Sequence, residues 1–382
     1  MLDPYRIRED FPSIAGEYIF MNNADSTGIP VPVLEKILAY YNEVKSRPGL
    51  ENTSSHRALE LYEEARGKVF EHFGAGEDSI IFTSSNLQSL MLILQSIDFK
   101  KNEVFLASSN AQGSVMDLLK EYVETVRGRL EVLEIGEESF EEKLKGALAG
   151  KSVKAALLNH VSGATGAILQ IDKIIPFLKE KGVTTILDAT YSAQRIRLNL
   201  PKTGVDYAFF KSGNMFSIEG LSILYASEER RIRLEKTPGY FIVKQAEREN
   251  CVCVVALAAA LEYLNRLGFE DVLNHEKNLA EGIVNTAAGE GVTFYQAALK
   301  ELRTGIVSLL LDPVPSSLLQ AILEDQFHIL AESGGFDSPL VLGKTGGREV
   351  LRLSPTVFNT IEEAKIVGER IAEVREAYVG KT

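Results

Sequence analysis

The sequence of 382 residues contains no tryptophan, two cysteines and five histidines. Cys251 and Cys253 are too close in sequence for a disulfide framework and favour a reducing compartment, so a cytoplasmic location is expected. The histidines lack the spacing of metal ligands, so no metal site is expected. No apolar run approaches the ~20 residues that span a bilayer, and the first residues, MLDPYRIRED, do not resemble a signal peptide.

Basic residues are the minority among the charged ones, 41 against 53 acidic residues, which gives a formal net charge of −12. Nucleic acids and anionic membranes attract proteins through a basic surface, so neither is expected as a partner. The length and the hydrophobic content of 45% are enough for two domains, each with its own core.

Short apolar runs alternate with helical periodicity from Ser79 to Tyr225. This alternation predicts an α/β domain with a mostly parallel, seven-stranded sheet and helices on both faces. The predicted strands are Ile80–Thr83, Glu103–Ala107, Leu130–Ile135, Val153–Leu158, Thr184–Leu187, Tyr207–Phe210 and Leu221–Tyr225. The predicted helices are Leu87–Ile97, Ser114–Val126, Phe140–Leu148 and Ile171–Lys181.

The C-terminal third has a different pattern. It begins with a strongly apolar helix, Cys251–Leu267, in which both cysteines are expected to be core residues. Further helices then alternate with short strands, which predicts a small α+β domain. We therefore expect a large domain over residues 1–244, whose N-terminal segment can pack on the small domain, and a small C-terminal domain over residues 245–382.

The strongest functional signal lies between Thr184 and Tyr225. A predicted strand ends at Asp188, a second strand follows Asp206, and a third follows Gly220. An acid at the carboxyl end of such a strand lies at the edge where α/β folds bind ligands.

This stretch resembles the core of class V pyridoxal-phosphate enzymes, which include cysteine desulfurases, selenocysteine lyases, kynureninase and serine–pyruvate aminotransferases. Their shared pattern is a strand ending in Asp, a strand leading to S-[GA]-H-K, and a G-P-x-G turn. The resemblance covers nearly the whole chain, and its landmarks are YEEAR, LDATYS, LRLSPTVFNTIEEA and the opening Met21–Ala24, which is similar to L-D-N-A-A. It implies a fold-type-I architecture, a homodimer, and pyridoxal phosphate as the cofactor.

The resemblance implies that Asp188 pairs with the pyridinium nitrogen of the cofactor. The lysine that forms the Schiff base falls on Asn214, because Lys211–Asn214 lies without a gap on S-G-H-K. An amide is neither nucleophilic nor basic, so Asn214 is expected to be inactive. Lys211 is the one amine nearby that can substitute for the missing lysine.

Other positions of the cofactor site are altered as well. In the phosphate loop, Ser85 and Asn86 can bind a phosphate at the start of a helix or act as an ordinary helix cap. Asn110 stands in the loop that carries the stacking residue of the family, and Tyr191 replaces the glutamine of D-x-A-Q. Ser212 is a further candidate for cofactor binding.

Two further residues differ from the family pattern in ways that disfavour cofactor binding. Gly163, after His160-Val161-Ser162, stands where the family has an asparagine that contacts the cofactor ring. Glu219 lies in the G-P-x-G turn, where a carboxylate would repel a phosphate.

Arg352 and His56 are the candidate substrate-binding residues. Arg352 falls on the arginine that clamps the substrate carboxylate in the family, or else it pairs with a structural acid. His56, in S-H-R, lies near the mouth of the site or only begins a helix. The nucleophilic cysteine of the desulfurases falls on Asp337, and Cys251 and Cys253 are not placed to replace it, which disfavours desulfuration.

Two hypotheses follow. In the first, the chain is a homodimeric family member that is degenerate at the cofactor site, lacks pyridoxal-phosphate catalysis and binds a small carboxylate. In the second, it is an active aminotransferase or lyase acting on an amino acid, with Lys211 as the imine-forming residue or with non-covalent pyridoxal phosphate. If no pyridinium is present, Asp188 needs another donor, and Tyr191, Lys211 and Arg195 are the candidates.

Overall fold

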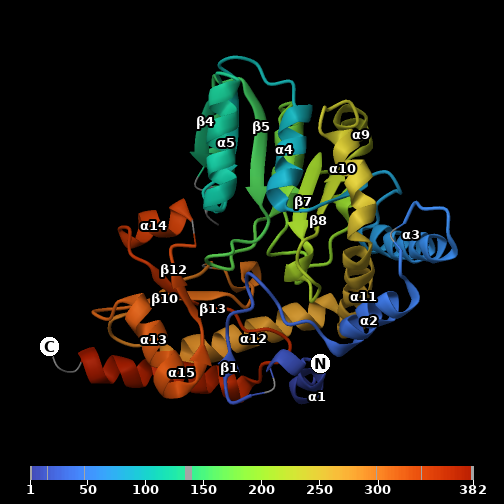
Figure 1. Ribbon diagram of the computed structural model, residues 1–382. Helices are drawn as coiled ribbons and strands as arrows, with labels where there is room; N and C mark the ends of the chain where they lie inside the picture. Colours follow the sequence, from blue (N-terminus) through green and yellow to red (C-terminus); the bar gives the residue numbers. More distant parts are fainter. Residues whose placement is uncertain are drawn as a thin grey trace.

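The computed structural model describes residues 2–14, 16–46, 48–133, 140–297, 299–336 and 338–379. The chain forms two lobes, a large one built on a central sheet and a smaller one that contains the C-terminal helix (Figure 1).

The large lobe contains a seven-stranded sheet with the order β2-β8-β7-β6-β5-β3-β4. Only β8 runs against the other strands, because the ten-residue connection after β7 is too short for a parallel crossover. The mostly parallel seven-stranded sheet predicted from the sequence is therefore confirmed. Its strands are β2 (Ile80–Thr83), β3 (Val104–Ser108), β4 (Arg129–Leu133), β5 (Val153–Asn159), β6 (Thr184–Asp188), β7 (Tyr207–Lys211) and β8 (Ser222–Ala226).

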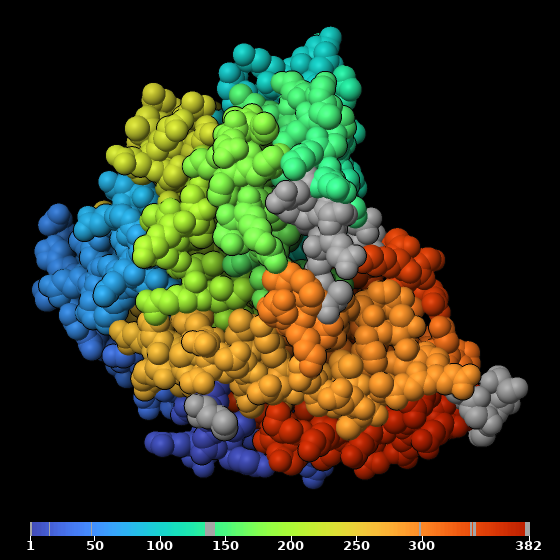
Figure 2. All heavy atoms as spheres, turned by 180° about the vertical axis from the view of Figure 1, so that it is seen from behind, coloured from blue at the N-terminus to red at the C-terminus, as the bar shows by residue number. Residues whose placement is uncertain are grey.

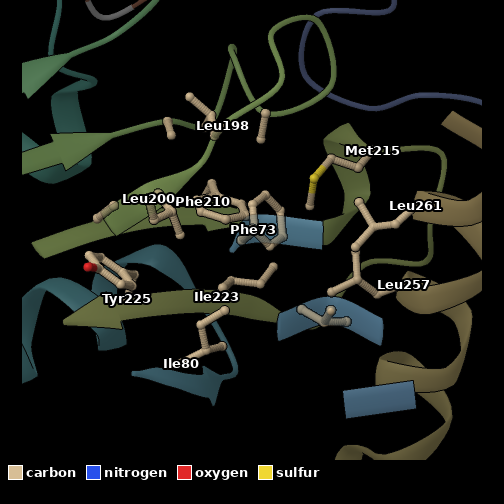
Figure 3. Close-up of a cluster of buried hydrophobic side chains, with 14 of the residues drawn as sticks. Phe73, Ile80, Leu198, Leu200, Phe210, Met215, Ile223, Tyr225, Leu257 and Leu261 are labelled. Carbon is tan, nitrogen blue, oxygen red and sulfur yellow. The ribbon is translucent and has the colours of Figure 1, made fainter. Parts of the chain in front are cut away.

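Helices cover both faces of this sheet, as the alternating pattern predicts. One face packs on α4 (Asn86–Ser96), α5 (Gly113–Thr125), α9 (Glu228–Leu234) and α10 (Tyr240–Ala246). The other face packs on α2 (Val31–Glu43), α3 (Thr53–Phe73), α6 (Phe140–Leu148), α7 (Ile171–Glu180) and α11 (Cys251–Leu267). Figure 3 shows part of the second core, where Phe73 of α3, Phe210 of β7 and Leu261 of α11 point toward one another.

Helices α10 and α11 belong to one helical stretch, Tyr240–Leu267, which is long and apolar enough to cross a membrane by length and composition. However, 56% of its most apolar window is buried inside the protein, and α11 packs on α2 and α3. The α11 part of this stretch is therefore a helix of the protein core. The expectation from the sequence that no apolar run approaches this length is therefore wrong for this stretch.

The small lobe has a four-stranded antiparallel sheet with the order β12-β13-β10-β9. The strands are β9 (Val292–Tyr295), β10 (Val307–Leu311), β12 (Glu332–Gly334) and β13 (Val350–Leu353). The helices of this lobe are α12 (Phe269–Ala287), α13 (Ser316–Phe327), α14 (Pro339–Thr345) and α15 (Ile361–Val379). Seen from behind, the gold-to-orange band of α11 and α12 runs beneath the green surface of the large lobe (Figure 2).

The N-terminal segment joins the small lobe. After α1 (Pro4–Glu9), strand β1 (Ile19–Phe20) pairs in parallel with β11 (Ile329–Leu330). Helix α11 shares the core of the large sheet although it follows residue 244. The boundary between residues 244 and 245 stays a prediction.

Most predicted elements lie close to the observed ones, but several short elements were not predicted. Phe327 ends α13, and His328 adopts a left-handed conformation (φ 55°) that terminates the helix before β11. The short helices α1, α9, α10 and α14 were missed because fewer than three turns carry little periodicity. The end of the predicted strand Leu130–Ile135 lies outside the described residues.

Candidate functional site

A pocket of about 270 Å³ opens where the first turns of α4 and α5 approach β7 and the turn before β8. Its polar lining includes serines, amides, one lysine and one glutamate. The lining residues are Ser84, Ser85, Asn86, Leu87, Gln112, Ser114, Val115, Lys211, Gly213, Glu219, Gly220 and Leu221. Of the residues predicted from the sequence, the pocket brings together Ser85, Asn86 and Lys211.

Asp188 ends β6 and is buried. Its Oδ2 accepts a hydrogen bond from Asn159 Nδ2 at 3.0 Å, and its Oδ1 accepts from the backbone N–H of Thr190 at 3.0 Å and from the Thr190 hydroxyl at 2.5 Å. Burial raises the pKa of Asp188, while the Thr190 hydrogen bonds and the charge of Lys211 act in the opposite direction.

The three donors predicted for Asp188 are wrong. Tyr191 donates to Asp25, Lys211 donates to the backbone oxygen of Asp25, and Arg195 binds Glu276. The actual donor Asn159 ends β5 and is paired in register with Asp188, so it is brought into place by the sheet. The sequence signal for this donor was the position of Asn159 directly before His160.

Asn214 is fully buried in a short 3-10 turn, Ser212–Asn214, after β7. Its Nδ2 donates to the backbone oxygen of Ala24 at 2.5 Å. The next residue, Met215, is anchored in the core near Leu261 (Figure 3). On the other side, Lys211 pairs with Ser222 in the β7–β8 ladder. These two anchors hold the intervening residues in one register.

Lys211 is the last residue of β7 and is half-buried. Its Nζ donates to the backbone oxygen of Asp25 at 2.9 Å. Of the residues that line the pocket, Lys211 is the one that carries an ammonium group.

Tyr191 and Gly163 are in direct contact. A Cβ atom on residue 163 would lie 2.3 Å from two ring carbons of Tyr191, so only glycine fits beside this ring. The Tyr191 hydroxyl donates to Asp25 Oδ1 at 2.6 Å and accepts from Gln112 Nε2 at 2.6 Å. Burial, together with the charge of Asp25, raises the pKa of Tyr191, which keeps the hydroxyl protonated.

Arg352 lies on β13 and is completely buried. Its Nη2 forms ion pairs with Asp25 and Glu332, and its Nη1 donates to Gly163 O at 3.1 Å. Its guanidinium carbon lies 3.9 Å from the centre of the Phe336 ring. Of the two alternatives from the sequence, the structure therefore has the one in which Arg352 pairs with acids of the chain.

Ser85 acts as the N-cap of α4, because its side chain accepts from the backbone N–H of Gln88. The Oε1 atom of Gln88 in turn accepts from the backbone N–H and the hydroxyl of Ser84. Asn86 bridges Thr190 and Ser222, at 2.8 and 2.7 Å. The predicted role as a helix cap is confirmed for Ser85, and Asn86 links α4 to the loop after Asp188.

The other predicted site residues lie outside the pocket lining. Asn110 accepts from the Ser162 hydroxyl at 3.1 Å. The hydroxyl of Ser212 donates to backbone oxygens of the turn before β8, at Ile218 and Leu221. His56 is exposed in the first turn of α3, as the simpler of its two interpretations expected.

The cysteines do not face the pocket. Cys251 is buried, and burial raises the pKa of its thiol to about 11, which disfavours a thiolate. Cys253 is partly buried, and burial raises its pKa as well. Asp337, the position expected for a desulfurase nucleophile, lies outside the described residues.

Asp25 is the main residue that the sequence interpretation missed. It receives Tyr191 and Arg352 on its carboxylate and Lys211 on its backbone oxygen. The sequence signal for Asp25 was its position directly after Met21–Ala24. The similar motif L-D-N-A-A has its final alanine at this position, whereas this chain has an acid.

Comparisons with known proteins agree with this architecture. The family described as aminotransferase class-V matches residues 19–367. A probable cysteine desulfurase of Pyrococcus abyssi is 24% identical over 95% of this chain and 95% of its own length. A probable cysteine desulfurase of Methanothermobacter thermautotrophicus is 22% identical over 96% of this chain and 97% of its own length.

Solved structures show the same fold. The apo structure of the cysteine desulfurase from Thermococcus onnurineus has a TM-score of 0.89 at 24% identity and covers 99% of both chains. A C-DES mutant with glycine covalently linked to its PLP cofactor has a TM-score of 0.79 at 16% identity, over 96% of this chain and 99% of that one. Pyridoxal phosphate is thus the cofactor that the family resemblance implies.

Proposed function

Because this chain belongs to the aminotransferase class-V family, we propose that it keeps the family fold but has lost the covalent cofactor site and performs no catalysis through a Schiff base. The observation that carries this proposal is the buried amide of Asn214 at the expected lysine position. An amide nitrogen cannot form an imine or move a proton from the Cα atom of an amino acid.

Several residues around the pocket disfavour pyridoxal phosphate. The carboxylate of Asp188 accepts hydrogen bonds from Asn159 and Thr190, so it is stabilised without a pyridinium nitrogen. At the start of α4, the side-chain oxygen of Gln88 accepts hydrogen bonds from the backbone N–H and the hydroxyl of Ser84. Fewer donors are therefore left at this helix start to bind a phosphate. The carboxylate of Glu219 lines the same pocket and would repel a phosphate.

Binding of a small carboxylate through Arg352, expected from the sequence, is not favoured. Its Nη2 already faces Asp25 and Glu332, and its Nη1 is taken up by Gly163 O. A third carboxylate would add repulsion without an unpaired charge to offset it. What the pocket offers instead suits a small polar molecule held without a covalent bond, through Lys211, Gln112 and Ser114.

A second candidate function rests on Lys211, whose ammonium group lines the pocket. In that case Lys211 forms the imine, or pyridoxal phosphate binds non-covalently, and the chain is an aminotransferase or lyase acting on an amino acid. The relatives named as cysteine desulfurases make cysteine the first substrate to test.

The deciding experiment adds pyridoxal phosphate to the purified protein and follows the absorbance of the internal aldimine. Borohydride reduction and peptide mass spectrometry then locate any covalent adduct, and sulfide release from cysteine is measured in parallel. We expect no aldimine, no adduct and no sulfide. An adduct on Lys211, or sulfide release above background, would instead establish the second candidate.

Two variants calibrate this experiment. Lys211→Ala removes the pocket amine, so any absorbance that survives it does not come from Lys211. Asn214→Lys places an amine at the family position and shows whether the rest of the pocket still admits the cofactor. If wild type stays colourless and Asn214→Lys turns yellow, the loss is due to residue 214 itself.

We also propose that the chain is a homodimer. Leu87 and Met91 on α4 are 36% and 48% exposed, and Phe241 and Ile242 on α10 are 70% and 69% exposed. The two helices are neighbours, since a Cβ on Gly239 would lie 3.0 Å from Leu92 of α4. Exposed apolar groups of this kind suit an interface between copies of the chain. The cytoplasmic location and the absence of nucleic-acid and membrane partners stay predictions.

A further inference from the structure

Four residues beside the pocket form a closed ring of contacts. The Tyr191 ring packs on Gly163, the Tyr191 hydroxyl binds Asp25, Asp25 pairs with Arg352, and Arg352 binds the backbone of Gly163. We propose that Asp25 is an internal ligand of Arg352, a carboxylate supplied by the chain itself that closes this arginine to small carboxylates from solution.

The ring connects segments that are far apart in the sequence. Asp25 belongs to the N-terminal segment, Tyr191 follows β6 in the large lobe, and Arg352 is on β13 of the small lobe. Asp25 thus bonds to a side chain of each lobe, through Oδ1 to Tyr191 and through Oδ2 to Arg352.

The backbone around Asp25 is held on both sides, which places its carboxylate in advance. The backbone N–H groups of Asn23 and Ala24 donate to the Ser354 hydroxyl at 2.8 and 3.0 Å, from the small lobe. Lys211 of the large lobe binds the backbone oxygen of Asp25 at 2.9 Å. A carboxylate held in this way has no translational entropy left to lose when it pairs with Arg352.

A free carboxylate must compete with this held one. It would make the same contacts with the guanidinium, but it also loses translational and rotational freedom on binding. Glu332 pairs with the same nitrogen at 2.5 Å and adds a second negative charge. A small carboxylate at millimolar concentration should therefore fail to displace Asp25.

Tyr191 and Gly163 support this arrangement as a pair. Residue 163 has to be glycine because a Cβ there would overlap the Tyr191 ring. The hydroxyl of Tyr191, oriented by Gln112, donates to Asp25 Oδ1 and leaves Oδ2 for Arg352. The glycine, the tyrosine and the aspartate therefore depend on one another.

The test is chemical rescue of Asp25→Ala by acetate. Thermal unfolding is followed in sodium acetate and in sodium chloride at equal ionic strength and pH 7. We expect the variant to lose about 2–4 °C in Tm, and to recover at least half of that loss in acetate only. The wild type should show no difference between the two salts, because Asp25 already fills the site.

Two controls separate this effect from general anion binding. Asp312→Ala removes an aspartate that pairs with Arg348 on the surface, and it should show no acetate-specific recovery. Asp25→Ala combined with Arg352→Gln should also show none, since the guanidinium is gone. Equal stabilisation of wild type by acetate, or recovery in the double variant, would overturn the proposal.

A second measurement is available if Asp25→Ala fails to fold. Tyr191→Phe and Asp25→Asn keep the shapes of both side chains, and a double-mutant cycle measures their coupling through urea unfolding. Coupling is expected, and strictly additive effects would count against the ring. Neither measurement involves the cofactor, so a failure of the proposed function would not affect either result.

Discussion

Tyr191 and Gly163 show how two altered residues of a site can have a single physical cause. The tyrosine ring needs the space that a side chain at residue 163 would occupy, at 2.3 Å from its ring carbons. In the resemblance to the family, the two residues count as independent departures from the pattern. Their packing shows instead that a tyrosine at residue 191 requires a glycine at residue 163.

His72 is a buried side chain whose effect on the free energy of unfolding depends on pH. It lies among Phe73 and Phe269, and neither ring nitrogen has a hydrogen-bond partner among the described residues. Burial, followed by the charge of Arg197, lowers the pKa of His72 to about 4 from 6.5. The unfolded chain therefore binds a proton more readily than the folded one between these two pH values.

The resulting prediction concerns stability in acid. The contribution of neutral His72 is fully present above pH 6.5 and is lost as the pH falls toward 4, by at most about 3 kcal/mol. His72→Phe should abolish this part of the acid sensitivity. Urea midpoints at pH 7 and pH 5 measure it, and an equal loss of stability in variant and wild type would contradict the assignment to His72.

At the scale of elements, the edge of the large sheet is covered by a specific contact. β2 is an edge strand, and an uncovered edge exposes backbone groups to pairing with other chains. The backbone N–H of Phe82 donates to the buried carboxylate of Glu247 at 2.7 Å, and Lys244 pairs with the other oxygen at 2.9 Å. Glu247, which follows α10, thus provides the hydrogen-bond acceptor that this edge strand would otherwise lack.

Removing this carboxylate should destabilise the fold. Glu247→Ala leaves the Phe82 N–H buried without an acceptor, at a cost of about 1–3 kcal/mol. Glu229→Ala is the matched control, because Glu229 is 74% exposed and forms only a loose pair with Arg233; it should change stability by less than about 0.5 kcal/mol. Equal urea midpoints for the two variants would show that Glu247 does not support the edge.

At the scale of the whole molecule, the two lobes are joined through buried polar contacts. Arg195, after β6, pairs with Glu276 on α12 at 2.7 Å, and both side chains are fully buried. Thr356 donates to the other oxygen of Glu276 at 3.0 Å. Together with the ring through Asp25, this pair fixes the small lobe against the carboxyl ends of the large sheet.

The assembly of the molecule can be tested on α10. Light scattering coupled to size exclusion should give the mass of two chains for wild type. Phe241→Asp combined with Ile242→Asp should give the mass of one chain, because two charges would be buried at the interface. Ile366→Asp, at a 38% exposed position on α15, is the control and should stay dimeric. A single-chain mass for wild type at all concentrations would refute the homodimer.

Local patterns in the sequence were enough to predict the family fold, the order of the strands along the chain and the position of Asp188 at the end of a strand. Local periodicity predicts these features. Once two strands pair, their register also fixes the motif residues beside them, as the pairing of Lys211 with Ser222 shows.

The groups that those residues contact depend on how distant segments of the chain pack together. Asp188 binds Asn159 across two strands, and Arg352 binds Asp25, whose position in the sequence is 327 residues away. Hydrogen-bond and ion-pair partners depend on which distant segments the packing brings within about 3 Å of one another. A local pattern can draw attention to a residue such as Asp25 or Asn159, but it does not say which side chain that residue meets, so the partners of Asp188 were predicted wrongly.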